Sequence, residues 1–193
     1  MDESIRAFIA VELEPSIQSQ LALIIQQLKT SVPGKVKWTP EKNLHLTLKF
    51  LGDVYTWEIS SLHQMMRNIA NQARSFSTKV DHLGAFPSPN HPRVVWAGLS
   101  EAVELVRLAR AIEESSRKLG YDAEEKPFTP HLTLGRVRPE INRQEQTVLA
   151  NCIRTVSTPT VSSIQVSSIT LFQSILKPGG AEYINLHESH FNY

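Results

Sequence analysis

The tetrapeptide His-Leu-Thr-Leu occurs twice in this chain, at positions 45–48 and again at positions 131–134. Side chains along an extended strand alternate between its two faces. Each copy therefore places its leucines on one face and its histidine and threonine on the other. In the first copy, the same alternation places Lys49 on the face of His45 and Thr47. The sequence predicts two strands, each with a buried leucine face and an imidazole–hydroxyl face.

Two histidines that meet across a groove suit general acid–base catalysis without a metal. Free imidazole titrates near about pH 6.5, so one ring can take a proton from water while the other donates one to a departing alkoxide. The hydroxyls of Thr47 and Thr133 would donate hydrogen bonds to charge that develops on a phosphoryl group. A phosphodiester fits this set of groups. The spacing makes His45 and His131 equivalent and does not say which is the acid.

Other chemistries fit the sequence less well. Two histidines on separate strands can ligate zinc, but no third ligand stands at a fitting spacing, and there is no His-x-x-x-His or His-Glu-x-x-His motif. Cys152 falls on a helical pattern and is interpreted as a core residue. A serine hydrolase would need a Gly-x-Ser-x-Gly elbow, which is absent from the sequence. We therefore expect neither a metal nor a cofactor. The remaining histidines lack symmetric partners, and most of them are interpreted as surface residues. They are His63, His82, His91, His187 and His190.

The elements that must position the motifs also occur in duplicate, displaced by 86 or 87 positions. The matched apolar strands are 6–13 with 93–99, and 80–86 with 166–172. Helical spacing of apolar residues predicts four helices, marked by apolar residues over 17–28, 59–69, 105–112 and 141–153. The third ends at the stop signal Leu119-Gly120. Each half therefore reads strand, helix, motif strand, helix, strand. Proline and glycine predict loops at 86–92, which separates the halves, and at 176–180.

Strict alternation along the motif strands indicates one packed and one solvated face, which favours antiparallel sheets. No glycine-rich phosphate loop follows the first strand, which argues against a parallel nucleotide-binding fold. We predict an α+β fold of two pseudo-symmetric lobes, each a mainly antiparallel sheet with two helices, that enclose a central cleft. The predicted single domain spans 1–193, with internal repeats at about 4–88 and 92–175 and a C-terminal strand at 181–188.

Charge and composition narrow the partners and the location. A formal net charge of +1 does not suit a protein that coats long duplex nucleic acid. It leaves room for a local anionic site, which the basic residues near the motifs fit: Lys35, Lys37, Lys49, Lys126, Arg136 and Arg138. The apolar runs are too short for a bilayer, no signal-peptide pattern is visible, and the single cysteine excludes an internal disulfide. We expect a cytoplasmic monomer without membrane contact.

Paired His-x-Thr-x motifs in duplicated halves resemble the 2H phosphoesterase superfamily. More narrowly, the chain resembles the RNA 2′,3′-cyclic phosphodiesterases, historically called 2′–5′ RNA ligases. The resemblance runs nearly end to end and is carried by five stretches: 6–11, 38–52, 93–98, 126–137 and 172–183.

This resemblance implies a bilobal fold with a basic, water-filled cleft and no catalytic metal. It implies hydrolysis of a terminal 2′,3′-cyclic phosphate, on RNA 3′ ends or small nucleotides, to a 2′-phosphomonoester. In the family's usual assignment His45 is the proton donor to the departing 3′ oxygen and His131 is the proton acceptor that activates water. Thr47 and Thr133 would hold the phosphate.

Phe50 and Arg136 match family residues that line the cleft near base and phosphate, where an arginine gives charge-assisted hydrogen bonds. Strict alternation sends both to the leucine face, away from the histidines. They reach the cleft if the strands end or bulge after Leu48 and Leu134, and Gly135 favours a bulge in the second copy. Relatives commonly carry alanine where this chain has Gly135, and we expect that difference to leave the site intact.

Two alternatives to hydrolysis stay open. The same acid–base pair can join RNA ends through a 2′–5′ bond, although hydrolysis should dominate in water unless the attacking hydroxyl is held close. The chain could also bind RNA termini or nucleotides without catalysis. The intact histidines of both motifs argue against that third reading.

Overall fold

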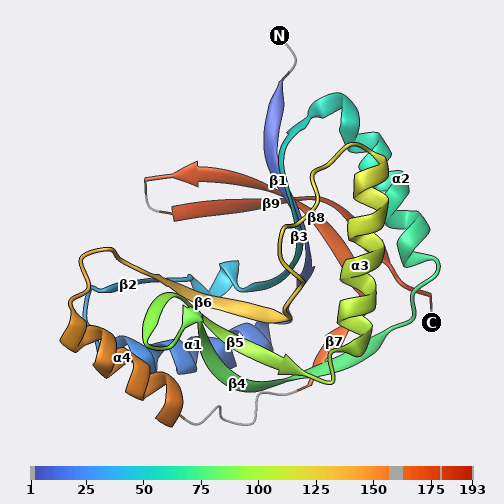
Figure 1. The fold of residues 1–193 in the computed structure, drawn as a ribbon. Helices are drawn as coiled ribbons and strands as arrows, with labels where there is room; N and C mark the ends of the chain where they lie inside the picture. The colour runs from blue at the N-terminus through green and yellow to red at the C-terminus, as the bar shows by residue number, and fades with distance from the viewer. Residues whose placement is uncertain (1–2, 157–162, 179, 193) are drawn as a thin grey trace.

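Two antiparallel sheets form the centre of the computed structural model, which describes residues 3–156, 163–178 and 180–192 (Figure 1). The first sheet has the order β3 (His45–Tyr55), β1 (Ser4–Glu12), β8 (Ser168–Lys177) and β9 (Gly180–His190). The second has the order β2 (Val36–Trp38), β6 (His131–Val137), β5 (His91–Ser100), β4 (Phe76–Ser88) and β7 (Ile164–Val166). The prediction of an α+β fold with antiparallel sheets is confirmed.

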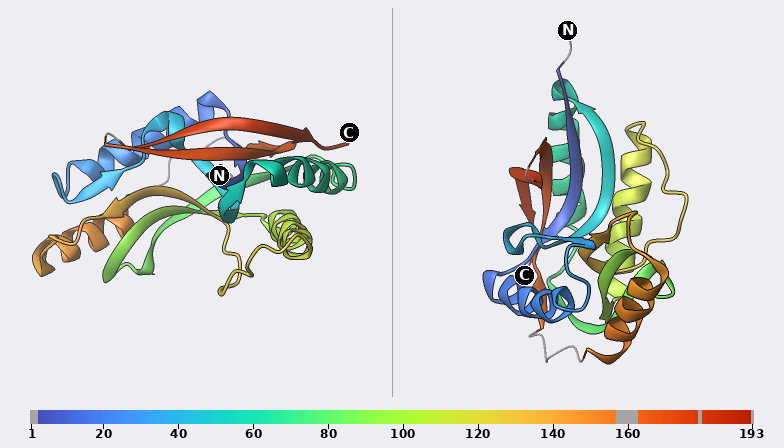
Figure 2. Two further views of the ribbon diagram at one scale, coloured as in Figure 1. Left: turned by 90° about the horizontal axis from the view of Figure 1, so that it is seen from above. Right: turned by 90° about the vertical axis from the view of Figure 1, so that its left-hand side faces the viewer.

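Four α-helices lie in the described part of the chain: α1 (Pro15–Lys29), α2 (Ile59–Ala70), α3 (Val103–Lys118) and α4 (Arg143–Thr155). Each is amphipathic, as its apolar spacing predicts. Helix α1 contacts α4, and α2 contacts α3; Figure 2 shows the two pairs at opposite ends of the sheets. In the described residues, no helix is long and apolar enough to span a membrane.

One hydrophobic core joins both sheets and all four helices. Its members include Ile9 of β1, Leu46 of β3, Leu132 of β6, Ile24 of α1, Leu62 of α2, Leu105 of α3 and Leu149 of α4. The leucine faces of both motif strands are packed into this core. Because the core is shared, the two sheets stabilise one another, and the histidine faces are left on the side away from it.

The two sheets do not follow the two halves of the sequence. Strand β4 follows the first motif strand in the chain but pairs with β5 and β7 of the second sheet. Strand β8 follows the second motif strand but pairs with β1 of the first sheet. Alternation identifies a segment as a strand without saying which neighbour it hydrogen-bonds. Each sheet therefore contains strands from both halves.

The described residues of the stretches predicted as loops are mostly strand, and residue 179 of the second stretch lies outside the described residues. Strand β4 continues to Ser88 and β5 begins at His91, with Pro87 paired to Pro92 where the register shifts. Strands β8 and β9 likewise continue up to Lys177 and from Gly180. Proline is tolerated at the end of a hairpin, where the ladder does not need its missing N–H. The prediction was wrong because it treated proline content as a break in the chain's extended structure.

Candidate active site

The motif strands bury their leucines and leave their histidines and threonines half-buried on the opposite face. In β3, Leu46 is fully buried between His45 and Thr47, and β6 repeats the pattern with Leu132 between His131 and Thr133. Strand β3 contacts strand β6. The two motifs therefore lie where the two sheets meet.

A backbone carbonyl two residues earlier in the chain holds each histidine ring. Nδ1 of His45 lies 2.8 Å from the carbonyl oxygen of Asn43, and Nδ1 of His131 lies 2.7 Å from that of Thr129. Since a carbonyl only accepts, Nδ1 carries the hydrogen and Nε2 is the atom left for proton transfer. Nε2 of His45 accepts from the hydroxyl of Thr47 at 2.9 Å.

Aromatic rings surround both imidazoles. The ring centroid of His45 lies 4.9 Å from that of Phe8 and 5.2 Å from that of Tyr183, which meets it edge-on. The ring of His131 lies 5.0 Å from Phe86, at 90°. These rings take the place of water around the histidines, and so they weaken the solvation of an imidazolium.

The surroundings of both histidines favour the neutral ring in the free protein. Burial lowers the pKa of His45, and the hydrogen bond to the Asn43 carbonyl partly opposes that effect. Burial also lowers the pKa of His131, the Thr129 carbonyl again opposes, and the positive charge of Arg136 lowers this pKa further. A bound anion would raise both pKa values, because an opposite charge favours the protonated ring.

A β-bulge at Leu48 interrupts the alternation in β3, because two consecutive residues of β1 pair with Thr47 and Lys49. The bulge turns Lys49 inward, where the residue is 3% exposed. It turns Phe50 to the histidine face, where its ring centroid lies 6.1 Å from that of Phe8. The prediction that Lys49 shares the face of His45 is therefore wrong, since alternation holds only while the pairing is regular.

Strand β6 has the equivalent bulge at Leu134. Gly135 takes the inward position and Arg136 takes the histidine face. The charge of Arg136 lowers the pKa of His131 in its own sheet and acts in the same direction on Tyr183 of β9, whose pKa burial raises. The charge of Arg136 on β6 therefore acts on a residue of each sheet.

The lysines near the motifs have different surroundings. Lys37 lies directly opposite Arg136 in the pairing of β2 with β6, so it lies beside the candidate site. Lys35 forms an ion pair with Glu145, N to O 3.2 Å, and Lys49 lies in the core. Of these residues, Arg136 and Lys37 bring positive charge to the candidate site.

Sequence reasoning did not find the aromatic residues that lie against the two histidines. Phe86 and Phe172 occupy matched positions in matched strands, and each lies close to the histidine of the opposite half. Their separation in the sequence equals that of the two motif histidines, and this match could have identified them. Tyr183 had no such signal, because it lies on β9 beyond the duplicated strands.

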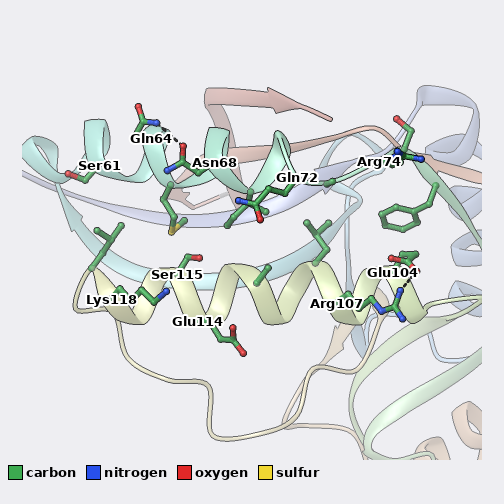
Figure 3. A pocket seen from close by; sticks show the side chains of 18 residues that line it. Ser61, Gln64, Asn68, Gln72, Arg74, Glu104, Arg107, Glu114, Ser115 and Lys118 are labelled. Atoms are coloured by element: carbon green, nitrogen blue, oxygen red, sulfur yellow. Dashed lines mark hydrogen bonds and ion pairs between the residues drawn. The ribbon is translucent and has the colours of Figure 1, made fainter. Parts of the chain in front are cut away.

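The described residues include a small hollow beside the first motif and a larger groove away from it. One, of about 260 Å³, adjoins His45 and is walled by Phe172 and Tyr183. A larger groove of about 1200 Å³ runs between α2 and α3 (Figure 3), and none of the predicted site residues line it. Size alone does not make the larger groove the reactive site, since the groups suited to proton transfer lie elsewhere. Within the described ranges, no three His, Cys, Asp or Glu residues are grouped to hold a metal ion.

Comparisons with known proteins identify the family of the chain. The LigT-like phosphoesterase family model matches the chain twice, over residues 11–96 and 98–183. A protein of Archaeoglobus fulgidus named RNA 2′,3′-cyclic phosphodiesterase is 36% identical over 181 residues, which are 94% of this chain and 97% of the relative. One of the same name from Methanothermobacter thermautotrophicus is 33% identical over 182 residues, 94% and 96% of the two chains.

A solved structure extends the likeness to the fold. The crystal structure of E. coli LigT complexed with 3′-AMP superposes with a TM-score of 0.76 and 26% identity, and the match covers 99% of this chain and 100% of that one. The family model spans both copies of the His-Leu-Thr-Leu motif. The chain therefore belongs to the LigT-like phosphoesterase family.

Proposed function

We propose that this chain hydrolyses terminal 2′,3′-cyclic phosphates on RNA, or on small nucleotides, to 2′-phosphomonoesters without a metal. One observation carries the proposal. Two histidines from opposite sheets are each fixed through Nδ1 to a carbonyl, which leaves two Nε2 atoms for proton transfer. The relatives named RNA 2′,3′-cyclic phosphodiesterase support the same reaction.

In this reaction His131 is the base. The charge of Arg136 disfavours its protonation, so the neutral ring takes a proton from water as the water oxygen attacks phosphorus. The bond from phosphorus to the 3′ oxygen breaks, and protonated His45 gives its Nε2 proton to that oxygen. His45 gains this proton when the anionic phosphate binds, because the nearby negative charge raises its pKa.

Thr47 and Thr133 donate hydrogen bonds to the phosphoryl oxygens, and Arg136 adds a charge-assisted bond. Thr47 makes its contact by leaving the Nε2 atom of His45, to which it donates in the free protein. The departing 3′ oxygen belongs to the terminal ribose, so the group that protonates it must lie beside that ribose. The terminal nucleoside therefore binds on the side of His45, where Phe50 offers an exposed ring for stacking.

The proposal extends to a cytoplasmic monomer. The single cysteine suits a reducing compartment, and one shared core makes the chain self-contained. Sedimentation equilibrium at micromolar concentration should give the mass of one chain, and a concentration-dependent increase in mass would contradict the monomer.

The deciding experiment is product analysis. An RNA that ends in a 2′,3′-cyclic phosphate is incubated with the protein in excess chelator, and the product phosphate is located by 31P NMR. We expect a 2′-phosphomonoester at the rate seen without chelator. No turnover, or turnover that the chelator abolishes, would refute the proposal.

The same mixture tests the two alternative functions. Adding an RNA with a free 5′-hydroxyl tests ligation. RNA that binds to the protein but stays unchanged would indicate a non-catalytic binder.

A further inference from the structure

Lys49 is the one charged residue that is buried in the described parts of the chain. Its Nζ donates to Oε2 of Glu113 on α3 at 2.7 Å and to the carbonyl oxygen of Asp122 at 2.6 Å. The lysine side chain is 2% exposed and that of Glu113 is 27% exposed. A buried charge without partners is costly, so these contacts fix the ammonium group in one place.

The same ion pair fixes the connection that leads to the second motif. Residues 121–130 join α3 to β6 and contain no helix or strand. Lys49 holds this segment at Asp122, and Oε1 of Glu113 accepts the backbone N–H of Glu124 at 3.2 Å. Towards its end, the carbonyl of Thr129 holds Nδ1 of His131. Lys49, which directly follows the first motif, therefore anchors the segment that orients the ring of His131.

The bulge at Leu48 connects the Lys49–Glu113 ion pair to the first motif as well. The irregular pairing that turns Lys49 into the core is what turns Phe50 onto the histidine face. The equivalent inward position in β6 is Gly135, where an added Cβ would lie 2.8 Å from the side chains of Trp38 and Val36. The second bulge is therefore packed by apolar groups, and the first is held by an ion pair.

We propose that the Lys49–Glu113 pair positions both halves of the site at once. It holds the bulge that presents Phe50, and it holds the segment that orients His131. Neither side chain touches the reacting atoms, so both are positioning residues. The inference rests on the proposed hydrolysis for its kinetic readout, and the state of the His131 ring supplies a readout that does not need activity.

The kinetic arm compares Lys49→Met with a matched control, Lys79→Met. Lys79 forms an exposed ion pair with Glu101 at 3.0 Å, with both side chains more than half exposed. On a dinucleotide 2′,3′-cyclic phosphate, we expect kcat of Lys49→Met to fall by about 10- to 100-fold, the effect of misplacing a group by roughly 1 Å. The control should stay within about twofold. A kcat for Lys49→Met equal to that of the control, at a temperature where both are folded, would refute the inference.

The structural arm uses 15N-labelled histidine and NMR. In the unaltered protein His131 should show the tautomer with hydrogen on Nδ1, and in Lys49→Met it should shift towards a mixture of tautomers. His45, which is held by Asn43 instead, should not change. A purely stabilising ion pair would lower the unfolding temperature but leave the His131 tautomer as it was, which would refute the inference.

If Lys49→Met does not fold, Glu113→Gln carries the same two measurements, because it keeps the size of the side chain and removes only the charge. An intact tautomer and intact kcat in that variant would again refute the coupling. An unaltered protein without hydrolytic activity would instead refute the proposed function, and the tautomer comparison would still test the anchor.

Discussion

The two motif histidines have the same neighbours in sequence but different environments. The edge of Tyr183 covers His45, and this tyrosine lies on β9, outside the duplicated strands. The charge of Arg136 acts on His131, and the equivalent position in β3 holds Phe50. The pseudo-symmetry that makes acid and base indistinguishable in sequence is therefore broken at the level of single residues.

Replacing either histidine by glutamine should cost about 10²- to 10⁴-fold in kcat/KM, since the acid and the base are each needed once per turnover. Steady-state hydrolysis of a nucleoside 2′,3′-cyclic phosphate measures the loss. His91→Gln, which changes an exposed histidine of β5, should retain full activity. A His45 or His131 variant that keeps more than about a tenth of the activity would contradict the acid–base roles.

Arg136→Met should change the pH profile as well as the rate. Removing the positive charge raises the pKa of His131, because that charge lowers it in the intact protein. The base must be neutral, so the acidic limb of kcat/KM should move to higher pH. Arg138→Met, two residues along the chain, is the matched control and should leave the limb in place. Movement of the basic limb instead would make His131 the acid.

At the scale of elements, periodicity predicted the helices and the motif strands but not the bulges. Alternation of the leucines in β3 and β6 requires only the sequence of each strand. The bulges at Leu48 and Leu134 depend on which residues of β1 and β5 pair with them, and that is set by packing between strands. This is why Phe50 and Arg136 could be placed near the histidines only by family resemblance, and why Lys49 was placed on the wrong face.

Gly135→Ala should destabilise the fold without removing a reacting group. An added Cβ would lie 2.8 Å from Trp38 and Val36, and overpacking of this kind costs about 1–3 kcal/mol. We expect a lower denaturant midpoint for Gly135→Ala and a smaller loss in a Val36→Ala background, where room has been made. Equal losses in the two backgrounds would show that the contact with Val36 does not set the cost. Alanine at position 135 is then expected to leave the reacting groups of the site intact but to lower the stability of the fold.

At the scale of the whole molecule, the exchange of β4 and β8 between the sheets was beyond sequence reasoning. The duplication was visible because matched patterns recur along the chain, but a repeat in sequence does not fix which sheet a strand joins. The long-range pairings of β1 with β8 and of β4 with β7 decide that. They also make the two halves depend on one another.

Separated halves should therefore fail to fold alone. A fragment 1–90 would hold β1 with β3 but leave β2 and β4 without the strands β5 and β6 that lie between them. Far-UV circular dichroism of fragments 1–90 and 91–193 should show little structure for each, and co-expression should restore the sheets. A stably folded single half would contradict the structural dependence.

Stability should fall below neutral pH, because four histidines are held neutral by the fold. Burial lowers the pKa of His45, His63, His131 and His187. His63 of α2 and His187 of β9 are half-buried rather than surface residues, and their rings stack with centroids 4.1 Å apart. Each also feels the charge of Arg67, which lowers both pKa values further.

The unfolded chain binds protons at each histidine near about pH 6.5, and the folded chain does so only at lower pH. The stabilisation is therefore complete above the unfolded pKa and is lost as the pH falls from there through the lower pKa of the folded chain. In urea unfolding at pH 7.5, 6.5 and 5.5, the urea concentration at the midpoint should fall as the pH is lowered. These pH values lie above the range where carboxylates titrate, so the histidines account for the change. The double variant His63→Gln/His187→Gln should flatten this dependence while the motif histidines still contribute. A midpoint that is constant or rises towards pH 5.5 would show that the fold does not hold these rings neutral.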